Sequence, residues 1–313
     1  MRATLIHNPG AGDEQHTAKR LLKELAEAGY DARLHSIKKE GVEKALEDPG
    51  DLVVVAGGDG SIKKVAIAIA GRGVPMAILP IGTANNIAKS LGTLGSVPEL
   101  IAGWRRAERR RLVIGRVATR WGSMRFVESV GVGVLTELVT RGDSEVYERT
   151  GLTGHAIDRA LLLLQRIVEE RAPRSRRLEL DGSDLSGEYL LVEVMNMPLV
   201  GPNIPLAPGA DYGDEQLEVV TVTERERELL AEYVRARLSG GAAPPELTRR
   251  RGTRVTMYAS PGELHVDDDA WRPEQPAGGA VPVPGPDEGE VTIALEDAGV
   301  EVLVGEPPRR SES

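Results

Sequence analysis

The chain has 313 residues, of which 41% are hydrophobic and 3% are aromatic. This length suits two domains, and the composition predicts cores built mainly from aliphatic side chains. The net charge of −9 argues against a general nucleic-acid binder, because affinity for phosphate backbones comes mainly from Lys and Arg. The absence of Cys excludes disulfides, thiolate metal sites and Cys nucleophiles.

The sequence shows no targeting or membrane segment. Residues 1–7 enter a strand-like stretch directly and lack the apolar core of a signal peptide. A run of about 18 apolar residues, the length that spans a bilayer, does not occur. We therefore expect a cytoplasmic protein.

The first 110 residues alternate strand patterns with helix patterns, which is typical of a parallel sheet with right-handed crossovers. Leu52–Ala56 is a continuous apolar run, as expected for a strand buried on both faces. Leu21, Leu22 and Leu25 have the spacing of one helix face. The predicted strands are 3–7, 32–37, 52–56 and 76–79, and the predicted helices are 14–28, 41–48, 61–70 and 84–91.

Strand patterns dominate from residue 111, and they predict a mostly β second domain over 111–295. One helix, 155–170, is expected to interrupt it. The Pro- and Gly-rich stretch 270–289 predicts an exposed loop, and 306–313 a disordered tail. The predicted strands of this domain are 112–118, 124–132, 177–181, 188–195, 217–222, 253–258, 263–267 and 291–295.

A glycine-rich turn, Gly57–Ser61, joins the buried strand 52–56 to the next helix. Glycine lets a backbone approach a ligand closely, and the N-terminus of a helix offers unpaired N–H groups that suit a phosphate. The turn is neither a Walker A loop nor a G-x-G-x-x-G fingerprint. The alternative interpretation is a plain tight turn. We expect Ser61 to cap the helix that follows Gly60 rather than to act as a nucleophile.

Two more polar, glycine-containing loops follow strands of the same predicted sheet. Asn8–Gly12 follows the first strand, and Gly82–Asn86 follows the fourth. Ligands of open α/β sheets bind beyond the carboxyl ends of the strands. Together with Gly57–Ser61, these loops predict a phosphate-binding site at one edge of the sheet.

The loops carry a family resemblance that extends over nearly the whole chain. The sequence resembles the diacylglycerol kinase catalytic-domain superfamily, which includes bacterial lipid kinases, sphingosine kinases and ceramide kinases. In the first domain, Asn8–Gly12 resembles N-P-x-x-G, Gly57–Ser61 resembles G-G-D-G-T, and Pro80–Asn86 resembles P-x-G-T-x-N-D. In the second domain, Asn196–Pro208 resembles N-x-x-x-x-G-G…P, Asp214–Leu217 resembles D-G-x-L, and Val266–Asp269 resembles D-G-E.

The resemblance implies an α/β nucleotide-binding domain (1–110) and a β-sandwich domain, with the active site in the cleft between them. It also implies that the last strands, about 296–305, return to the first domain. Its cofactors would be ATP and Mg²⁺, and Mg²⁺ prefers the carboxylate oxygens in which the motifs are rich.

The resemblance also assigns roles to individual residues. Asp59 would position Mg²⁺ and phosphate, and Asp214 would hold a structural Mg²⁺. Asp269, with Asp267 beside it, would accept the proton of a lipid hydroxyl, as phosphoryl transfer requires. The implied ATP site comprises Asn8, Pro9, Gly10, Gly12, Gly57, Gly58, Asp59, Gly60, Ser61, Lys64, Gly82, Thr83 and Asn86.

Departures from the family motifs occur at or beside their acidic residues. Asn86 stands where the family has Asp, and Asp269 stands where it has Glu. Asp268 replaces a turn glycine, although Asp adopts left-handed backbone more readily than most residues. Glu215 replaces the Gly that follows Asp214. Because small misplacements can cost ~100-fold in rate, these departures bear on activity.

We expect an ATP- and Mg²⁺-dependent kinase that phosphorylates a hydroxyl of diacylglycerol or a sphingoid-type lipid. It would contact the inner face of a membrane peripherally, as a monomer or an oligomer, and would not bind nucleic acid. One alternative is a weakly active or inactive nucleotide or lipid binder on the same scaffold, suggested by Asn86, Asp268 and Asp269. Another is a kinase of a small soluble alcohol, similar to the NAD kinases.

Other features have ordinary interpretations that we favour. The basic cluster Trp104–Arg111 predicts a solvated face rather than attraction to anionic lipid. Leu161–Leu164 predicts core packing, with a flank toward a lipid pocket as the alternative. The histidines lack metal-ligand spacing, so we expect surface or core roles for His7, His16, His35, His155 and His265.

Overall fold

The computed structural model describes all residues except 12–15, 38–40, 143–155, 242, 272–287 and 306–313. The chain forms two compact units, residues 1–114 with 297–313, and residues 115–296. The chain leaves the first unit within strand β5 (Glu108–Thr119) and returns to it within strand β18 (Gly289–Val304). Most of the predicted loop 270–289 and all of the predicted tail 306–313 lie outside the described residues.

The first unit contains the predicted parallel sheet. Its strand order is β2-β1-β3-β4-β18, and each neighbouring pair is parallel. Every residue of β3 is buried, as its apolar run predicted. The first four strands are β1 (Arg2–His7), β2 (Asp31–Ser36), β3 (Leu52–Gly57) and β4 (Met76–Pro80).

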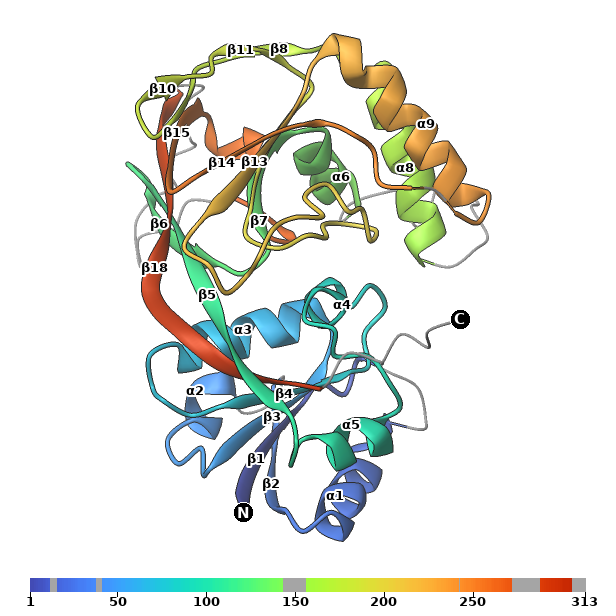
Figure 1. The fold of residues 1–313 in the computed structure, drawn as a ribbon, viewed down its shortest axis with the longest axis vertical. Helices are drawn as coiled ribbons and strands as arrows, with labels where there is room; N and C mark the ends of the chain where they lie inside the picture. The colour runs from blue at the N-terminus through green and yellow to red at the C-terminus, as the bar shows by residue number, and fades with distance from the viewer. Residues whose placement is uncertain (12–15, 38–40, 143–155, 242, 272–287, 306–313) are drawn as a thin grey trace, which may run out of the picture. The chain divides into compact units, whose positions relative to one another are not determined.

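Helices cover both faces of this sheet (Figure 1). On one face, Leu21 and Leu25 of the first helix share a core with Leu52 and Val54. The first helix begins later than predicted because Thr17 caps it, accepting a hydrogen bond from the Arg20 N–H at 3.4 Å. The helices are α1 (Ala18–Glu27), α2 (Gly41–Ala45), α3 (Asp59–Ile69), α4 (Asn86–Ser90) and α5 (Val97–Gly103), of which α5 was not predicted.

The second unit is a β sandwich, as predicted. One sheet is antiparallel, in the order β14-β13-β12-β7-β16-β17. Side chains of this sheet share a core with the second sheet, at Leu178 of β9 (Leu178–Leu180), Val255 of β15 (Arg254–Ala259) and Ile293 of β18. The strands of the antiparallel sheet are β7 (Ser129–Gly133), β12 (Leu191–Met195), β13 (Leu217–Val222), β14 (Thr248–Gly252), β16 (Leu264–Val266) and β17 (Asp269–Ala270).

The remaining strands of this unit are short, and two predicted strands are each divided. The predicted strand 124–132 is β6 and β7 with residues 127–128 between them, and 188–195 is β11 and β12. The other strands are β6 (Gly122–Phe126), β8 (Arg174–Arg176), β9 (Leu178–Leu180), β10 (Ser183–Asp184), β11 (Gly187–Tyr189) and β15 (Arg254–Ala259).

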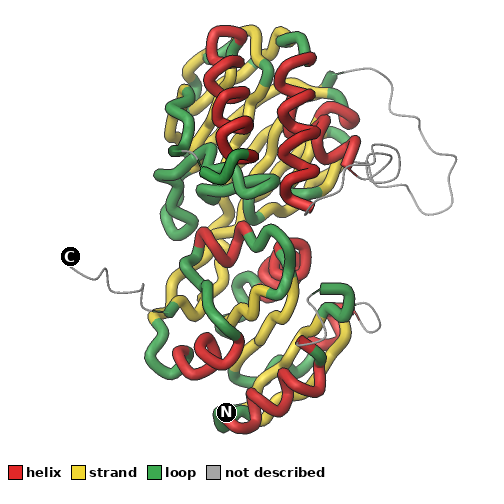
Figure 2. The backbone as a smooth tube through the Cα atoms, turned by 90° about the vertical axis from the view of Figure 1, so that its right-hand side faces the viewer, coloured by secondary structure: helices red, strands yellow, loops and turns green. Residues whose placement is uncertain are grey.

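The prediction of a single helix in this unit was wrong, because the described residues contain α6 (Val134–Gly142), α8 (Ala156–Glu170) and α9 (Arg227–Leu238). The helix α6 begins at Val134, directly after β7 ends at Gly133, so no turn separates the strand from the helix. The helices α8 and α9 lie side by side over the sheet (Figure 2). Leu161, Leu163 and Leu164 pack in the core as predicted, whereas Leu162 is exposed.

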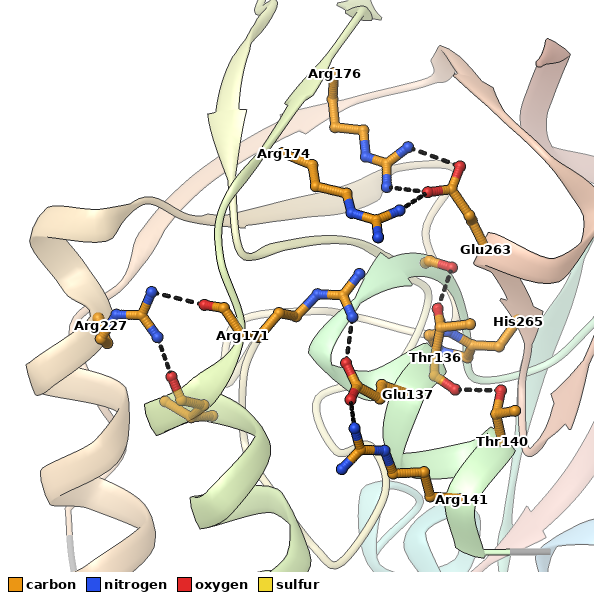
Figure 3. Close-up of polar contacts among 12 residues, drawn as sticks. Thr136, Glu137, Thr140, Arg141, Arg171, Arg174, Arg176, Arg227, Glu263 and His265 are labelled. Atoms are coloured by element: carbon orange, nitrogen blue, oxygen red, sulfur yellow. Dashed lines mark hydrogen bonds and ion pairs between the residues drawn. The ribbon is translucent and has the colours of Figure 1, made fainter. Parts of the chain in front are cut away.

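Arginine side chains form ion pairs and hydrogen bonds near the ends of these helices (Figure 3). Glu137 of α6 accepts hydrogen bonds from Arg141 and Arg171. Arg227 donates to the carbonyl oxygens of Val168 and, at 2.7 Å, Arg171, where cations suit the negative end of α8. None of the helices in the described part of the chain combines the length and apolar character needed to cross a membrane.

Glu263, directly before β16, forms ion pairs with two arginines of strand β8 (Figure 3). Its Oε1 lies 2.6 Å from the Nη1 of Arg174 and 2.9 Å from the Nη2 of Arg176, and the Arg176 side chain is 5% exposed. Hydrogen bonds from Arg176, opposed by partial burial, hold the pKa of Glu263 at about 2, below its ordinary value of 4.5. This ion pair therefore stabilises the sandwich above pH 4.5.

We predict that Glu263→Gln destabilises the protein by about 2 kcal/mol at pH 7, because Arg176 loses the charge that compensates its burial. The difference from the unmodified chain should shrink as the pH falls from 4.5 toward 2, where Glu263 becomes protonated. Thermal unfolding at pH 7, 4 and 3 measures both effects. The control is Glu288→Gln, since Glu288 lies 4.0 Å from Arg177 and both side chains are exposed.

Candidate functional site

Three loops of the first unit meet at the carboxyl ends of β1, β3 and β4. The Nδ2 of Asn8 donates to the Oγ of Ser61 at 3.1 Å. The loop after β4 touches the turn after β3 so closely that a Cβ on Gly82 would lie 2.4 Å from the Cα of Gly58. The predicted convergence of these loops is therefore present.

The turn after β3 leads directly into α3. The helix begins at Asp59 with Gly58 as its N-cap, and no side chain caps it. The prediction that Ser61 caps this helix was wrong, because Ser61 lies inside the first turn and its Oγ accepts from Asn8. A helix start without a capping side chain suits an anionic ligand.

Asp59 and Asn85 fix the loop after β4. The Asp59 carboxylate accepts a hydrogen bond from the Ile87 N–H at 2.9 Å, at the start of α4. Asn85 has left-handed backbone, with φ at 52°, and its side chain bonds both the N–H and the carbonyl oxygen of Gly82 at 3.1 and 2.9 Å. Asn85 was not among the predicted site residues, although Asn is well suited to this conformation.

The other predicted nucleotide-site residues differ in exposure. Pro9, Gly10, Thr83 and Lys64 are exposed, whereas Asn86 is buried. The Gly10 N–H donates to the Asn8 Oδ1 at 3.0 Å, which shapes the first loop. Gly12 lies outside the described residues. Their roles in binding ATP stay predictions.

In the second unit, Asp267 anchors a turn between β16 and β17. Its side chain is buried, and its Oδ1 accepts hydrogen bonds from the N–H groups of Glu128 at 2.7 Å and Ser129 at 3.1 Å. The left-handed residue of this turn is Asp267, with φ at 54°, and not Asp268 as we expected. Asp268 and Asp269 are exposed. The observed contacts of Asp267 are those of a residue that fixes the turn, and the catalytic roles stay predictions.

A second motif holds the same segment. The Nδ2 of Asn196 donates to the carbonyl oxygen of Val127 at 2.9 Å, and its backbone N–H donates to that of Glu128 at 2.9 Å. Asn196 and Asp267 therefore fix residues 127–129 from two directions. This segment was not predicted, because residues 124–132 were expected to form one strand.

Asp214 makes an ion pair with Arg251, and Arg251 also lies 3.1 Å from Glu218. Burial raises the pKa of Glu218, against the opposing effect of Arg251. Within the described residues, no three His, Asp or Glu side chains are grouped as a metal site. The role of Asp214 in holding Mg²⁺ stays a prediction.

Two other features lie apart from the predicted site residues. In the basic cluster, Arg105 donates to the Ala28 carbonyl oxygen and Arg109 pairs with Glu301, so the cluster is bonded to other parts of the first unit.

A hollow of about 500 Å³ opens in the second unit, where the Arg177 guanidinium stacks 3.7 Å over the ring of Tyr258. It is lined by Ser175, Arg176, Arg177, Ser186, Gly187, Tyr258 and Glu288.

Solved structures share this fold. A diacylglycerol kinase structure from Bacillus anthracis strain Sterne has a TM-score of 0.65, with 17% sequence identity, and covers 97% of each chain. Another structure from this strain reaches a TM-score of 0.70 at 18% identity, and covers 97% of this chain and 95% of its own. The α/β domain and the β sandwich therefore define the diacylglycerol kinase class of fold.

Sequence comparisons give the family. Residues 2–117 match the model of the diacylglycerol kinase catalytic domain, and residues 143–282 match that of the YegS C-terminal NAD kinase beta sandwich-like domain. The chain belongs to the diacylglycerol kinase catalytic-domain superfamily, as its motifs predicted.

Curated relatives agree with this assignment. The diacylglycerol kinase of Bacillus subtilis strain 168 is 28% identical over 250 residues, which cover 75% of this chain and 77% of the relative. The diacylglycerol kinase of Staphylococcus aureus strain bovine RF122 / ET3-1 is 27% identical over 203 residues, which cover 61% of this chain and 60% of the relative.

We predict that Gly82→Ala weakens ATP binding about tenfold or more. The new Cβ would lie 2.4 Å from the Gly58 Cα and would push the two loops apart. Isothermal titration calorimetry with ATP and Mg²⁺ measures the change. Gly103→Ala is the matched control, since a Cβ there meets nothing within 4 Å. Equal affinities of the two variants would contradict the prediction.

Proposed function

We propose that the chain is a cytoplasmic kinase that transfers the terminal phosphoryl group of ATP, bound as its Mg²⁺ complex, to a hydroxyl of diacylglycerol or a sphingoid-type lipid. The observation that carries the proposal is the meeting of the loops at Asn8, Gly58 and Gly82 in a unit that matches the diacylglycerol kinase catalytic domain. The names of the curated relatives support the lipid acceptor.

The first unit would bind the nucleotide. The uncapped start of α3 provides N–H groups for phosphate oxygens, and the glycines at 58 and 82 let the two loops beside it approach each other closely. Thr83 is exposed in the loop after β4, next to Gly82. Mg²⁺ bound with ATP would neutralise charge on the phosphates.

The second unit would provide the base. Asp269 is exposed at the end of the turn that Asp267 anchors, so its carboxylate is accessible to an acceptor hydroxyl. As a base it would take the hydroxyl proton while the oxygen attacks the terminal phosphorus of ATP, which leaves ADP and a phosphorylated lipid. A membrane-resident acceptor would bring the protein into peripheral contact with the inner face of the membrane.

The proposal is tested with purified protein, labelled ATP and Mg²⁺. Separate reactions contain micelles of diacylglycerol, micelles of a sphingoid base, or NAD in solution. We expect label in a lipid product. Transfer to none of the lipids, while a related active kinase labels them in parallel, would reject the proposal, and labelling of NAD alone would favour a soluble acceptor.

We predict that Asp269→Asn lowers kcat by about 100-fold or more, because the amide cannot accept the hydroxyl proton. The KM for ATP should change less than about threefold, since the change spares the nucleotide loops. Asp268→Asn is the matched control, because Asp268 is the adjacent exposed carboxylate. If both variants lose the same activity, Asp269 has no special role as a base.

The second candidate function is a nucleotide or lipid binder without turnover. It is favoured by Asn86 and Asp269, which depart from the Asp and Glu of the family motifs. A double reversion, Asn86→Asp with Asp269→Glu, separates the two candidates. A parent that binds ATP without turnover and a reverted variant that labels lipid would support the binder, whereas parental turnover that Asp269→Asn abolishes would eliminate it.

A further inference from the structure

Three residues form a row across the centre of the six-stranded sheet. Glu193 of β12 pairs in register with Gly131 of β7, and Gly131 pairs with His265 of β16. Neighbouring strands lie about 4.8 Å apart, so Glu193 and His265 are separated by a whole strand. Both side chains are buried, with exposed fractions of 0% and 1%.

Glycine at 131 allows the outer two side chains to meet. A Cβ on Gly131 would lie 1.9 Å from the Oε2 of Glu193, so the carboxylate occupies the space of the missing side chain. Across this space the His265 Nε2 lies 3.1 Å from the Glu193 Oε1. Any other residue at 131 would break this contact.

The second ring nitrogen of His265 is also held. Thr136 of α6 donates its hydroxyl hydrogen to the Gly131 carbonyl oxygen at 3.1 Å, and its Oγ1 lies 2.8 Å from the His265 Nδ1 (Figure 3). Burial lowers the pKa of His265, but the Glu193 and Asp267 carboxylates outweigh it, so the pKa is raised. A protonated ring donates from both nitrogens, to Thr136 and to Glu193.

The row lies next to the turn that contains Asp269. His265 is two residues before Asp267, and its register partner on β17 is Ala270, next to Asp269. A buried ion pair is weak support for stability, because apolar side chains of similar volume often stabilise a core as well or better. A pair at this place would instead fix a single position for the strand ends that flank the turn.

We propose that Glu193 and His265, paired across Gly131, are positioning residues that set the Asp267–Asp269 turn for phosphoryl transfer. The kinetic part rests on the proposed function, whereas the structural part does not. Neither side chain would touch a substrate. The contact would hold β16 against β12 so that Asp267 keeps its bonds to residues 127–129 and Asp269 keeps its place.

The test uses the full chain with His265→Gln, His265→Leu and Glu193→Gln. The His265→Gln side chain can still donate to Glu193, whereas His265→Leu leaves that carboxylate buried without its partner. We expect kcat to fall about threefold in His265→Gln and about 30-fold in His265→Leu, with the KM for ATP nearly unchanged. Glu193→Gln should behave as His265→Gln does. Recovery by the conservative variant distinguishes positioning from general destabilisation.

The control is Val222→Ala, which removes buried methyl groups from the same sheet outside the row. It should lower Tm without a selective loss of kcat. Hydrogen–deuterium exchange provides a second measurement that needs no activity. Amides of residues 127–129 and 264–270 should exchange about tenfold faster in His265→Leu than in Val222→Ala at matched loss of Tm.

The outcomes separate this inference from the proposed function. If the unmodified chain labels no lipid, the proposed function fails, and the exchange measurement alone decides whether the pair holds the turn. If the row variants match Val222→Ala in exchange, the positioning inference is overturned whatever the activity. An active chain whose kcat is unchanged in His265→Leu overturns the kinetic part.

Discussion

The contact between the backbones of Gly58 and Gly82 is the constraint on which the candidate nucleotide site depends. With 2.4 Å between the Gly58 Cα and a Cβ built on Gly82, no other residue fits at 82 without moving the loop. The contact joins the turn after β3 to the loop after β4, and Asp59 adds a second link through the start of α4. The parallel sheet brings these loops to one edge, so the site follows from the fold.

The second unit relies on a different device, a short segment fixed by distant side chains. Asn196 and Asp267 both form hydrogen bonds to residues 127–129, and the Glu193–His265 pair lies next to the Asp267–Asp269 turn. Here the exposed Asp269 is supported by buried polar groups, whose hydrogen bonds are costly to leave unmade in a low dielectric. Substitution of the buried groups would therefore affect the turn as strongly as substitution at its surface.

Sequence patterns predicted the parts of this structure that depend on local order. The apolar run at 52–56, the turn at 57–61 and the repeated alternation of strand with helix were enough for the parallel sheet and its loops. The helices α6 and α9 were missed, and α6 follows β7 without an intervening turn, since β7 ends at Gly133 and α6 begins at Val134. The row of Glu193, Gly131 and His265 depends on strand register between distant segments. Its one local sign was a carboxylate, Glu193, in an otherwise apolar strand.

The candidate nucleotide site is tested most directly by titrating isotopically labelled protein with ATP and Mg²⁺ and following the amides by NMR. We expect the largest shifts at the amides of residues 58–60 and 82–83, where the loops meet. Saturable binding that leaves these amides unchanged, or no binding at millimolar ATP, would contradict it.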